Sequence, residues 1–405
     1  MSLTENSMTM NTFYLGLLIA TLMQASLLVA ALTLKKKGSR LSNGLLSGII
    51  ALFSYYMLIK VLCGTDLILD YPHLAQTYRP LPFLIWPAFY FYLKSMIDPR
   101  FHFQIKDCMH LIPFTLYTFY LLPFFLASEE VKLQSVSIPL SGNYFFVVVL
   151  QTILLLFYIV QSYRILRSHQ EHIQNLFSDI EKKKLSWLNF FLITFGIIWV
   201  AAFIKAFLGI SYTGDFAIPP ILLCLTIYGI GYYALQQPEI FKDNHTEIKP
   251  DEKLTILRSA ATSSGAGQAL NMKSTPKYEY STLTSQELSK HGQKLIEYLK
   301  KEKPYTNSDL KLQDIALFLK LPPHQISQII NTELKCNFYT LINKYRIDQA
   351  KSQLIDSGKQ HLNIIEIAYE VGFNSKSAFN TAFKKNTGLT PTQYKKQRLS
   401  RSAAA

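Results

Sequence analysis

Seven stretches of roughly 20 apolar residues within the first 235 positions constrain the fold of this chain most strongly. At a rise of about 1.5 Å per helical residue, a run of this length crosses the hydrocarbon core of a bilayer. The runs are 13–34, 44–63, 81–97, 108–127, 144–163, 187–207 and 217–235. We therefore expect a seven-helix transmembrane bundle. The first and last residues of the third span are the least sharply defined, because this run carries Pro82, Pro87 and Lys94.

The loops between these runs differ in positive charge. Segments 35–43, 98–107 and 164–186 together carry 11 Lys and Arg, whereas segments 1–12, 64–80, 128–143 and 208–216 carry 2. Cytoplasmic loops of membrane proteins are enriched in Lys and Arg. The first run also precedes its basic cluster, the reverse of a cleavable signal peptide. The pattern predicts a multi-pass protein with its amino terminus outside and its carboxyl-terminal tail in the cytoplasm.

The composition changes abruptly after residue 235. Residues 236–284 are polar and include the Ser- and Gly-containing stretch Ser259–Gly267, which predicts a flexible linker. Residues 285–405 then hold 19 Lys and Arg against 10 Asp and Glu, and the whole chain has a net charge of +14. Much of the excess positive charge lies outside the apolar half, which favours nucleic acid over anionic lipid as the polyanionic partner.

Residues 285–397 are predicted to form two similar groups of short helices around one long helix. The pairs Thr284 with Glu287 and Asn363 with Glu366 have the spacing of capping boxes at helix starts. Short amphipathic helices are expected over 312–319 and 323–334 before the long helix, and over 364–371 and from Asn374 or Ser375 to Asn386 after it. The long helix, 338–355, would measure about 27 Å. Two helix-turn-helix units this far apart suit neighbouring major grooves, whose centres are about 34 Å apart.

The stretch IIEIAYEVGFNSKSAFNTAFKKNTGLTPTQYKK (364–396) closely resembles the second helix-turn-helix of AraC/XylS-type bacterial transcription regulators. Residues 309–354 are similar to the first unit and the connecting helix, so the resemblance covers about residues 285–397. It implies double-stranded DNA as a partner and pairing of binding sites, hence a homodimer. Two departures from the family pattern, Pro322-Pro323 at the first recognition helix and Gln328 and Thr381 where relatives often carry Arg, indicate fewer guanine contacts and weaker base reading by the first unit.

The same resemblance implies which side chains face DNA. Base contacts are expected from the exposed face of the second helix of each unit, and phosphate contacts from nearby lysines. The base-contact candidates are His324, Ser327 and Gln328 in the first unit, with Lys376, Ser377, Asn380 and Thr381 in the second. The phosphate-contact candidates are Lys384, Lys385 and Lys395.

Ionisable residues in or beside the apolar runs form a second group of candidates. Lys60, Lys94 and Lys205 lie near span ends, where lysine side chains can extend to the interface, and His110 is either an interface residue or a pocket residue. A membrane pocket containing His110, Lys94 and Lys205 would suit an anionic or polar signal ligand. The four cysteines have no CxxC spacing and indicate buried apolar positions, with no metal site and no cofactor.

Common catalytic signatures are absent from the sequence. No GxxxxGK[ST], HExxH or GxSxG motif occurs, which excludes the enzyme classes that those motifs serve. The alternative to a regulator is a multi-span transporter or receptor whose basic tail binds a protein partner, although the spans show no obvious internal repeat.

We therefore predict an all-α chain with a sensor domain in the bacterial inner membrane (1–235), a linker (236–284), an AraC-type DNA-binding domain (285–397) and a tail (398–405). The predicted function is that of a one-component transcription regulator embedded in membrane lipid, which responds to an unknown signal ligand or membrane partner. Cleavage within the linker to release the tail is an alternative mode of control.

Overall fold

The structure is a computed structural model that describes residues 2–34, 39–65, 67–98, 100–137, 144–207, 218–236, 284–356, 358 and 361–403. Every regular element in these ranges is a helix, apart from an isolated β-bridge between Phe177 and Lys311. The predicted all-α fold is confirmed. The predicted linker lies almost entirely outside the described residues.

The chain divides into two compact units. The apolar unit combines Met1–Arg167 with Leu185–Phe241, and the carboxyl-terminal unit combines Ser168–Lys184 with Lys242–Ala405. Segment 168–184 comes from the predicted loop 164–186 of the membrane half, and its membership of the second unit is a feature that the sequence did not predict.

The predicted apolar runs coincide with helices. They are α1 (Ser2–Leu34), α2 (Arg40–Gly64), α3 (Pro82–Ile97), α4 (Ile112–Phe125) with the preceding η3 (Ile105–Leu111), α6 (Tyr144–Leu176), α7 (Ser186–Phe207) and α8 (Ile218–Gln236). Shorter elements are η1 (Leu67–Leu69), η2 (Pro72–Leu74) and α5 (Glu129–Ser137). Among the residues that the structure describes, four segments are long and apolar enough to cross a membrane: Tyr14–Leu34, Arg40–Cys63, Ile105–Phe125 and Phe145–Leu176. Several apolar helices are thus confirmed, and seven crossings stay a prediction.

The interior of the apolar unit is built mainly from aliphatic and aromatic side chains of α1, α2, α3 and α7. The Phe195 ring stacks on Phe53 at a centroid distance of 5.3 Å and meets Trp86 edge-on at 5.4 Å. By contrast, α4 turns large apolar side chains outward, and Leu116 and Phe119 are each 65% exposed. The unit therefore has an apolar outer face as well as an apolar core. Cys224 is buried as expected, whereas Cys63 and Cys108 are exposed, because they lie on helix faces that no other described part of the chain covers.

Helix α6 continues to Leu176, although the apolar run ends near residue 163. The added turns are polar but carry apolar residues at helical spacing, including Leu166 and Ile173, which are buried. After the helix, η4 (Glu181–Lys183) folds segment 168–184 back on itself, and the His169 ring nitrogen Nε2 lies 3.1 Å from the Lys183 carbonyl oxygen. The segment is therefore a folded element of the carboxyl-terminal unit.

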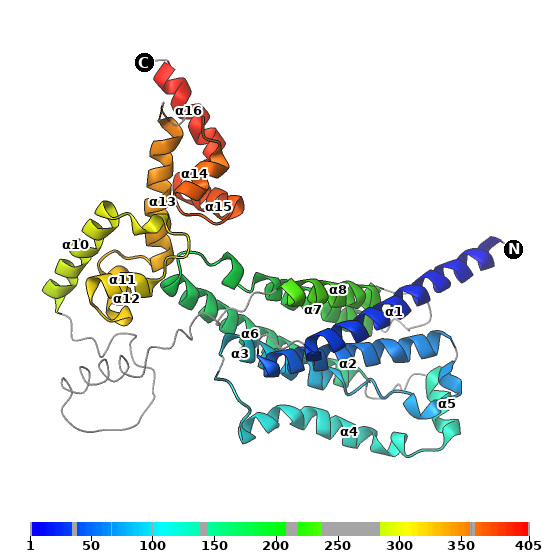
Figure 1. The fold of residues 1–405 in the computed structure, drawn as a ribbon. Coiled ribbons are helices and arrows are strands. Elements are labelled where there is room, and N and C mark those ends of the chain that lie inside the picture. The colour runs from blue at the N-terminus through cyan, green and yellow to red at the C-terminus, as the bar shows by residue number, and fades with distance from the viewer. Residues whose placement is uncertain are drawn as a thin grey trace, which may run out of the picture. The chain divides into compact units, whose positions relative to one another are not determined.

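The carboxyl-terminal unit arranges two helix groups along α13, as Figure 1 shows. The first group is α10 (Ser285–Lys301), η6 (Pro304–Thr306), α11 (Leu312–Leu319) and α12 (Pro323–Thr332), followed by α13 (Phe338–Ile355). The second group is α14 (Ile364–Glu370), α15 (Lys376–Thr387) and α16 (Pro391–Ala403). Each group has its own core, and one end of α13 contributes Phe338, Leu341 and Ile342 to the first. The other end contributes Ile347, Ala350 and Leu354 to the second.

The predicted helix starts are confirmed in atomic detail. Thr284 and Glu287 form a capping box, in which Glu287 N donates to Thr284 Oγ1 at 3.3 Å and Thr284 N donates to Glu287 Oε2 at 2.8 Å. Asn363 and Glu366 form the second predicted box. Such caps satisfy backbone N–H groups that a helix start leaves without partners. The predicted long helix matches α13 at both ends, whereas α12 ends at Thr332, earlier than expected.

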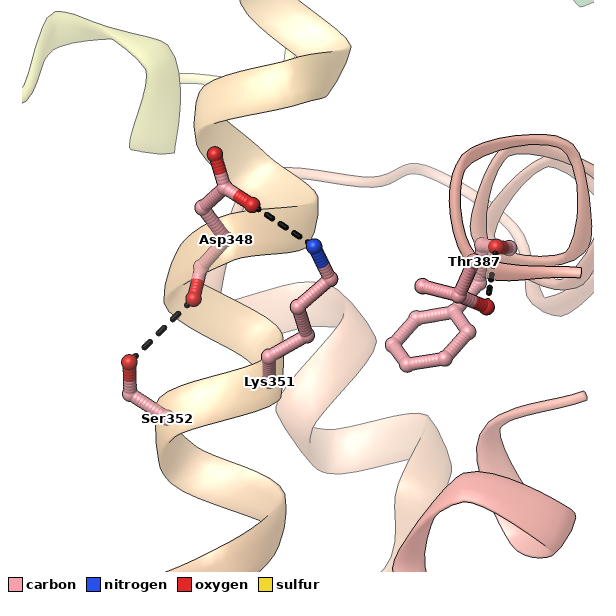
Figure 2. A network of polar contacts seen from close by, with 5 residues as sticks. Asp348, Lys351, Ser352 and Thr387 are labelled. Carbon is pink, nitrogen blue, oxygen red and sulfur yellow. Dashed lines mark hydrogen bonds and ion pairs between the residues drawn. The ribbon is translucent and has the colours of Figure 1, made fainter. Parts of the chain in front are cut away.

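The outer surface of α13 adds little to its stability. Lys351 Nζ lies 2.8 Å from Asp348 Oδ1, and Ser352 Oγ donates to the Asp348 carbonyl oxygen at 3.2 Å (Figure 2). An exposed pair of this kind contributes about 0.5 kcal/mol or less. The position of α13 therefore depends on its buried residues and not on this surface network.

Candidate nucleic-acid interface

The first helix-turn-helix consists of α11 and α12. Lys320 ends α11 in the left-handed conformation, with φ of 56°. Pro322 then precedes α12 without a side-chain cap, and Pro323 occupies the first helical position as predicted. Ile326 and Ile329 are fully buried against the core, which leaves the opposite face of α12 for contacts outside the domain.

The three candidate base-contacting residues of α12 differ in exposure. His324 is exposed, and Ser327 is half-buried with its Oγ accepting from Asn331 Nδ2 at 3.3 Å. Gln328 is only 8% exposed, because it lies on the side of α12 that carries the buried Ile329. The expectation that Gln328 presents its amide to DNA is therefore not met in this conformation, and His324 and Ser327 remain the candidates of this helix.

The second helix-turn-helix consists of α14 and α15. Its turn requires Gly372, whose φ is +98° and whose missing Cβ would collide with the Tyr305 carbonyl oxygen and lie 2.8 Å from the Thr306 carbonyl oxygen. Ser375 caps α15 by accepting from Ala378 N at 3.1 Å. Phe379 and Phe383 are fully buried in the core of this unit. The sequence predicted the start of this helix at Asn374 or Ser375.

The candidate residues of α15 lie together on its outer side. Lys376, Ser377 and Thr381 are exposed, and Asn380 is half-buried. Their spacing of one, four and five positions places them over the first two turns of one helix surface. A lysine, two hydroxyls and an amide there can donate to or accept from base edges in a major groove.

The candidate phosphate-contacting lysines flank this surface. Lys384 and Lys385 are exposed in the last turn of α15, and Lys395 is half-buried on α16. Their ammonium groups are suited to phosphate contacts, which position a protein without reading sequence. Lys384 and Lys385 thus follow the predicted base-contacting residues on the same helix, and Lys395 lies on the next helix.

Arg346 ties the two helix groups together from the middle of α13. Its guanidinium is 1% exposed and donates through Nε to the Tyr305 carbonyl oxygen at 2.7 Å and through Nη2 to the Asn307 carbonyl oxygen at 2.8 Å. Its Cζ atom also lies 5.5 Å from the ring centroid of Phe373, which belongs to the turn between α14 and α15. Burial lowers the pKa of Arg346 to about 10, opposed by the nearby charge of Asp179, so the group stays charged at neutral pH. Arg346 is therefore a scaffold residue that links the two helix groups.

Two carboxylates that the sequence did not single out lie at the start of α15. Asn374 Nδ2 donates to Asp179 Oδ2 at 2.8 Å, and Ser375 Oγ donates to Glu181 Oε2 at 2.6 Å. Both acids belong to segment 168–184. Burial raises the pKa of Tyr339 on α13, and the charges of Asp179 and Glu181 raise it further. Contacts between residues 195 positions apart leave no pattern in a single sequence.

The membrane-half candidates come together only in part. Lys94 Nζ lies 4.7 Å from the Tyr90 ring centroid, and the His110 ring lies 5.0 Å from the Phe91 ring and shares a 2.6 Å hydrogen bond with Tyr158 Oη. Lys94 and His110 thus flank one aromatic cluster. The side chain of Lys205 lies outside the described residues, and a ligand role for the three stays a prediction. Within the described residues, no group of three or more His, Cys, Asp or Glu is placed to hold a metal ion.

Comparisons with known proteins match the carboxyl-terminal part of the chain. The family described as "Helix-turn-helix domain" matches residues 315–397. The chain is 25% identical over 126 residues to the regulatory protein PocR of Salmonella typhimurium, covering 31% of this chain and 41% of PocR. It is 31% identical over 87 residues to the melibiose operon regulatory protein of Escherichia coli K12, covering 22% of this chain and 28% of that protein.

A solved structure, the C-terminal domain of AraT, a response regulator from Geobacillus stearothermophilus, is 33% identical. The match covers 29% of this chain and 88% of that one, with a TM-score of 0.24. The chain spans less than half the length of the two curated regulators. Both are named as regulatory proteins and not as enzymes, in agreement with the predicted class. The match over 315–397 includes all of α12 to α15, so this part of the chain is a helix-turn-helix domain of the AraC type.

Proposed function

We propose that the chain is a membrane-embedded one-component transcription regulator that binds double-stranded DNA through both helix-turn-helix units. The observation that carries this proposal is the pair of units on α13, an 18-residue helix whose two ends belong to separate cores. A helix of this length separates the two recognition helices by a distance suited to adjacent major grooves. The net positive charge of residues 285–405 favours the same partner.

The second helix-turn-helix is the stronger reader of bases in this proposal. Lys376, Ser377, Asn380 and Thr381 contact base edges, while Lys384, Lys385 and Lys395 contact phosphates. In the first helix-turn-helix only His324 and Ser327 remain available for base contacts. The protein acts as a homodimer, which is what its resemblance to AraC/XylS-type regulators implies.

The proposed membrane location rests on exposed apolar side chains of the long helices. Phe146 on α6 is 70% exposed and Ile193 on α7 is 62% exposed, alongside the outward face of α4. Apolar faces of this extent are unfavourable in water and favourable against lipid tails. The distribution of loop charges supports an amino terminus outside and the DNA-binding domain in the cytoplasm of a bacterium. A signal in or across the membrane then changes promoter binding.

DNA binding is tested with the full-length chain in lipid nanodiscs, by mapping and footprinting the genomic fragments that it retains. Protection of two adjacent major grooves is expected, with affinity that falls steeply as salt rises. Lys376→Ala should weaken binding, whereas Lys300→Ala, an equal charge loss on α10, should change it little. Failure to retain any fragment at low salt would contradict the proposal, and capture of a protein in place of DNA would favour the receptor alternative.

Location is tested separately by cell fractionation and by a fluorescent reporter at the carboxyl end that folds only in the cytoplasm. The chain should stay with membranes after carbonate extraction, and the reporter should fluoresce. Recovery in the soluble fraction would contradict membrane embedding without bearing on DNA binding. A full-length chain in the membrane while its target genes are switched on would exclude release by cleavage.

A further inference from the structure

Segment 168–184 is anchored to the DNA-binding domain by apolar packing. Ile173, Phe177 and Ile180 are at most 9% exposed and form a small core with the half-buried Tyr339 of α13. Lys183 Nζ lies 4.6 Å from the Phe177 ring centroid, so the end of the segment packs against this small core. The buried side chains show that the segment is packed into the domain and does not merely touch it.

Backbone and buried polar contacts hold the same segment in register. Ser178 N donates to the Leu310 carbonyl oxygen at 3.2 Å, which joins the segment to the loop before α11. Arg346 donates to Ser178 twice, through Nη1 to its carbonyl oxygen at 3.3 Å and through Nη2 to its Oγ at 3.1 Å. The arginine that links the two helix groups therefore also fixes this segment.

From this anchor, the segment extends two carboxylates to the start of the second recognition helix. Asp179 uses Oδ1 to accept from Glu181 N at 3.0 Å and Oδ2 to accept from Asn374, so its orientation is fixed at both oxygens. Glu181 accepts the hydroxyl proton of Ser375, while the oxygen of that hydroxyl still caps α15. Two anionic acceptors thus take the donors of Asn374 and Ser375.

A phosphate group would need the same donors. The first residues of a recognition helix meet the DNA, and a helix amino terminus attracts anions through its free N–H groups and its dipole. Carboxylate and phosphate oxygens are both charged acceptors for N–H and O–H donors. Asp179 and Glu181 therefore occupy positions at α15 that a phosphate would occupy, and they bring negative charge that repels the DNA backbone.

We propose that segment 168–184 is an intramolecular clamp on the second recognition helix, and that docking of this clamp and DNA binding by α15 exclude each other. The inference rests on the proposed DNA-binding function and adds how it is controlled. The clamp begins with the last turns of α6, residues 168–176, and α7 starts shortly after its end, and both helices carry predicted membrane spans. A signal that changes the ends of these helices acts directly on the clamp, and DNA binding must in turn favour the released state.

The first test removes the two charges without touching the DNA-binding domain. The variant Asp179→Asn/Glu181→Gln, in the full-length chain in nanodiscs, keeps the size and Oδ1 acceptor of residue 179. If about nine-tenths of molecules are clamped, full release would raise DNA affinity about tenfold. Glu171→Gln is the matched control, because Glu171 is an exposed acid of the same segment that lies beside Asn331 on α12 and Asn337 at the start of α13.

The outcomes separate the clamp from the proposed function. A rise in affinity for the double variant alone supports the clamp. Measurable DNA binding that is unchanged in the double variant overturns the clamp and leaves the function standing. An equal rise per charge removed in Glu171→Gln also overturns it, because long-range repulsion would then explain the effect. Absence of binding by every variant at low salt contradicts the proposed function itself.

The second test observes release directly by amide hydrogen exchange of the wild-type chain in nanodiscs. Peptides covering 173–184 should exchange slowly without DNA, because Ser178 N donates to Leu310 and Ile180 is buried. Adding the mapped DNA fragment should speed their exchange while slowing exchange in α15. Protection of 173–184 that persists with α15 protected by DNA overturns the clamp.

Discussion

The two helix-turn-helix units share a scaffold but differ where each recognition helix begins. Both α12 and α15 bury apolar residues against their own core and follow a turn with a positive φ. Helix α12 begins at Pro322-Pro323 without a side-chain cap, whereas α15 begins at Ser375, whose hydroxyl caps the helix and donates to Glu181. Pro322 and Pro323 offer no side-chain donor, whereas Asn374 and Ser375 present donors that an anion can use.

This difference indicates that the two units contribute unequally to DNA recognition. The first helix-turn-helix holds α13 and keeps Gln328 buried, so it contributes few polar groups to a DNA surface. The second exposes Lys376, Ser377 and Thr381 and is also the one that segment 168–184 contacts. The unit better equipped to read DNA is therefore the one within reach of a carboxylate from the membrane half of the sequence.

The largest difference in stability between the two units is expected at the residues of their turns. Gly372→Ala should destabilise the second helix-turn-helix by about 2–4 kcal/mol, because a Cβ meets the Tyr305 and Thr306 carbonyl oxygens and the backbone has a positive φ. Hydrogen exchange across α14 and α15 in the full-length chain would measure this loss. In the first unit, Lys320→Gly should cost less than about 1 kcal/mol, since a side chain is already accommodated at φ of 56°.

Gly388→Ala is the matched control for backbone conformation. Its φ is +77°, but nothing lies within 4 Å of the added Cβ, so only the cost of the left-handed conformation, about 1–2 kcal/mol, is expected. Equal losses at the two glycines would show that the contact with Tyr305 is not what limits residue 372.

Base recognition should differ between the units by a smaller free energy. Lys376→Ala with Thr381→Ala is expected to weaken binding to the mapped site by about 1–3 kcal/mol for each well-formed base contact that the substitutions remove, and to relax specificity at those positions. His324→Ala with Ser327→Ala should cost less than about 1 kcal/mol by the same assay. A larger effect from the α12 pair would reverse the proposed order of the two units.

Many structural features of the two units were predictable from the sequence, because they depend on residues that are close together in the chain. Apolar spacing located the helices, and the capping boxes placed two helix starts to within a residue or two. The resemblance over 364–396 identified the exposed face of α15. Local patterns of this kind survive in a single chain because the interacting residues are three or four positions apart.

The parts that could not be predicted depend on distant contacts. Nothing near Asp179 indicates that its partner is Asn374, and the apolar spacing of Ile173 with Phe177 fits any amphipathic helix end. Gln328 appeared exposed by analogy with family members, but its burial depends on packing within this particular core. Likewise, the sequence located Lys94 and His110 without showing that both flank Tyr90 and Phe91.

The helix starts offer a way to make the two units more alike. Ser375→Ala should destabilise α15 by about 1 kcal/mol through loss of its cap, and Pro322→Ser should stabilise α12 by a similar or smaller amount by supplying one. Exchange rates of the first-turn amides of each helix would measure both. No gain from Pro322→Ser would indicate that the fixed backbone of proline already compensates for the missing cap.

The smallest change in stability is expected at the capping box that begins α10 in the first helix group. Hydrogen bonds from Thr284 N and Oγ1 lower the pKa of Glu287 below its ordinary value of 4.5, so the folded helix binds this proton less tightly than the unfolded chain does. The stabilisation is therefore fully present above the unfolded pKa and is lost as pH falls through the lower folded pKa. Exchange of α10, corrected for the intrinsic pH dependence, should rise more steeply with acid in the wild type than in Glu287→Gln. Glu297→Gln, an exposed change later in the same helix, should leave the wild-type slope intact, and a slope that Glu287→Gln does not flatten would remove the capping box as its cause.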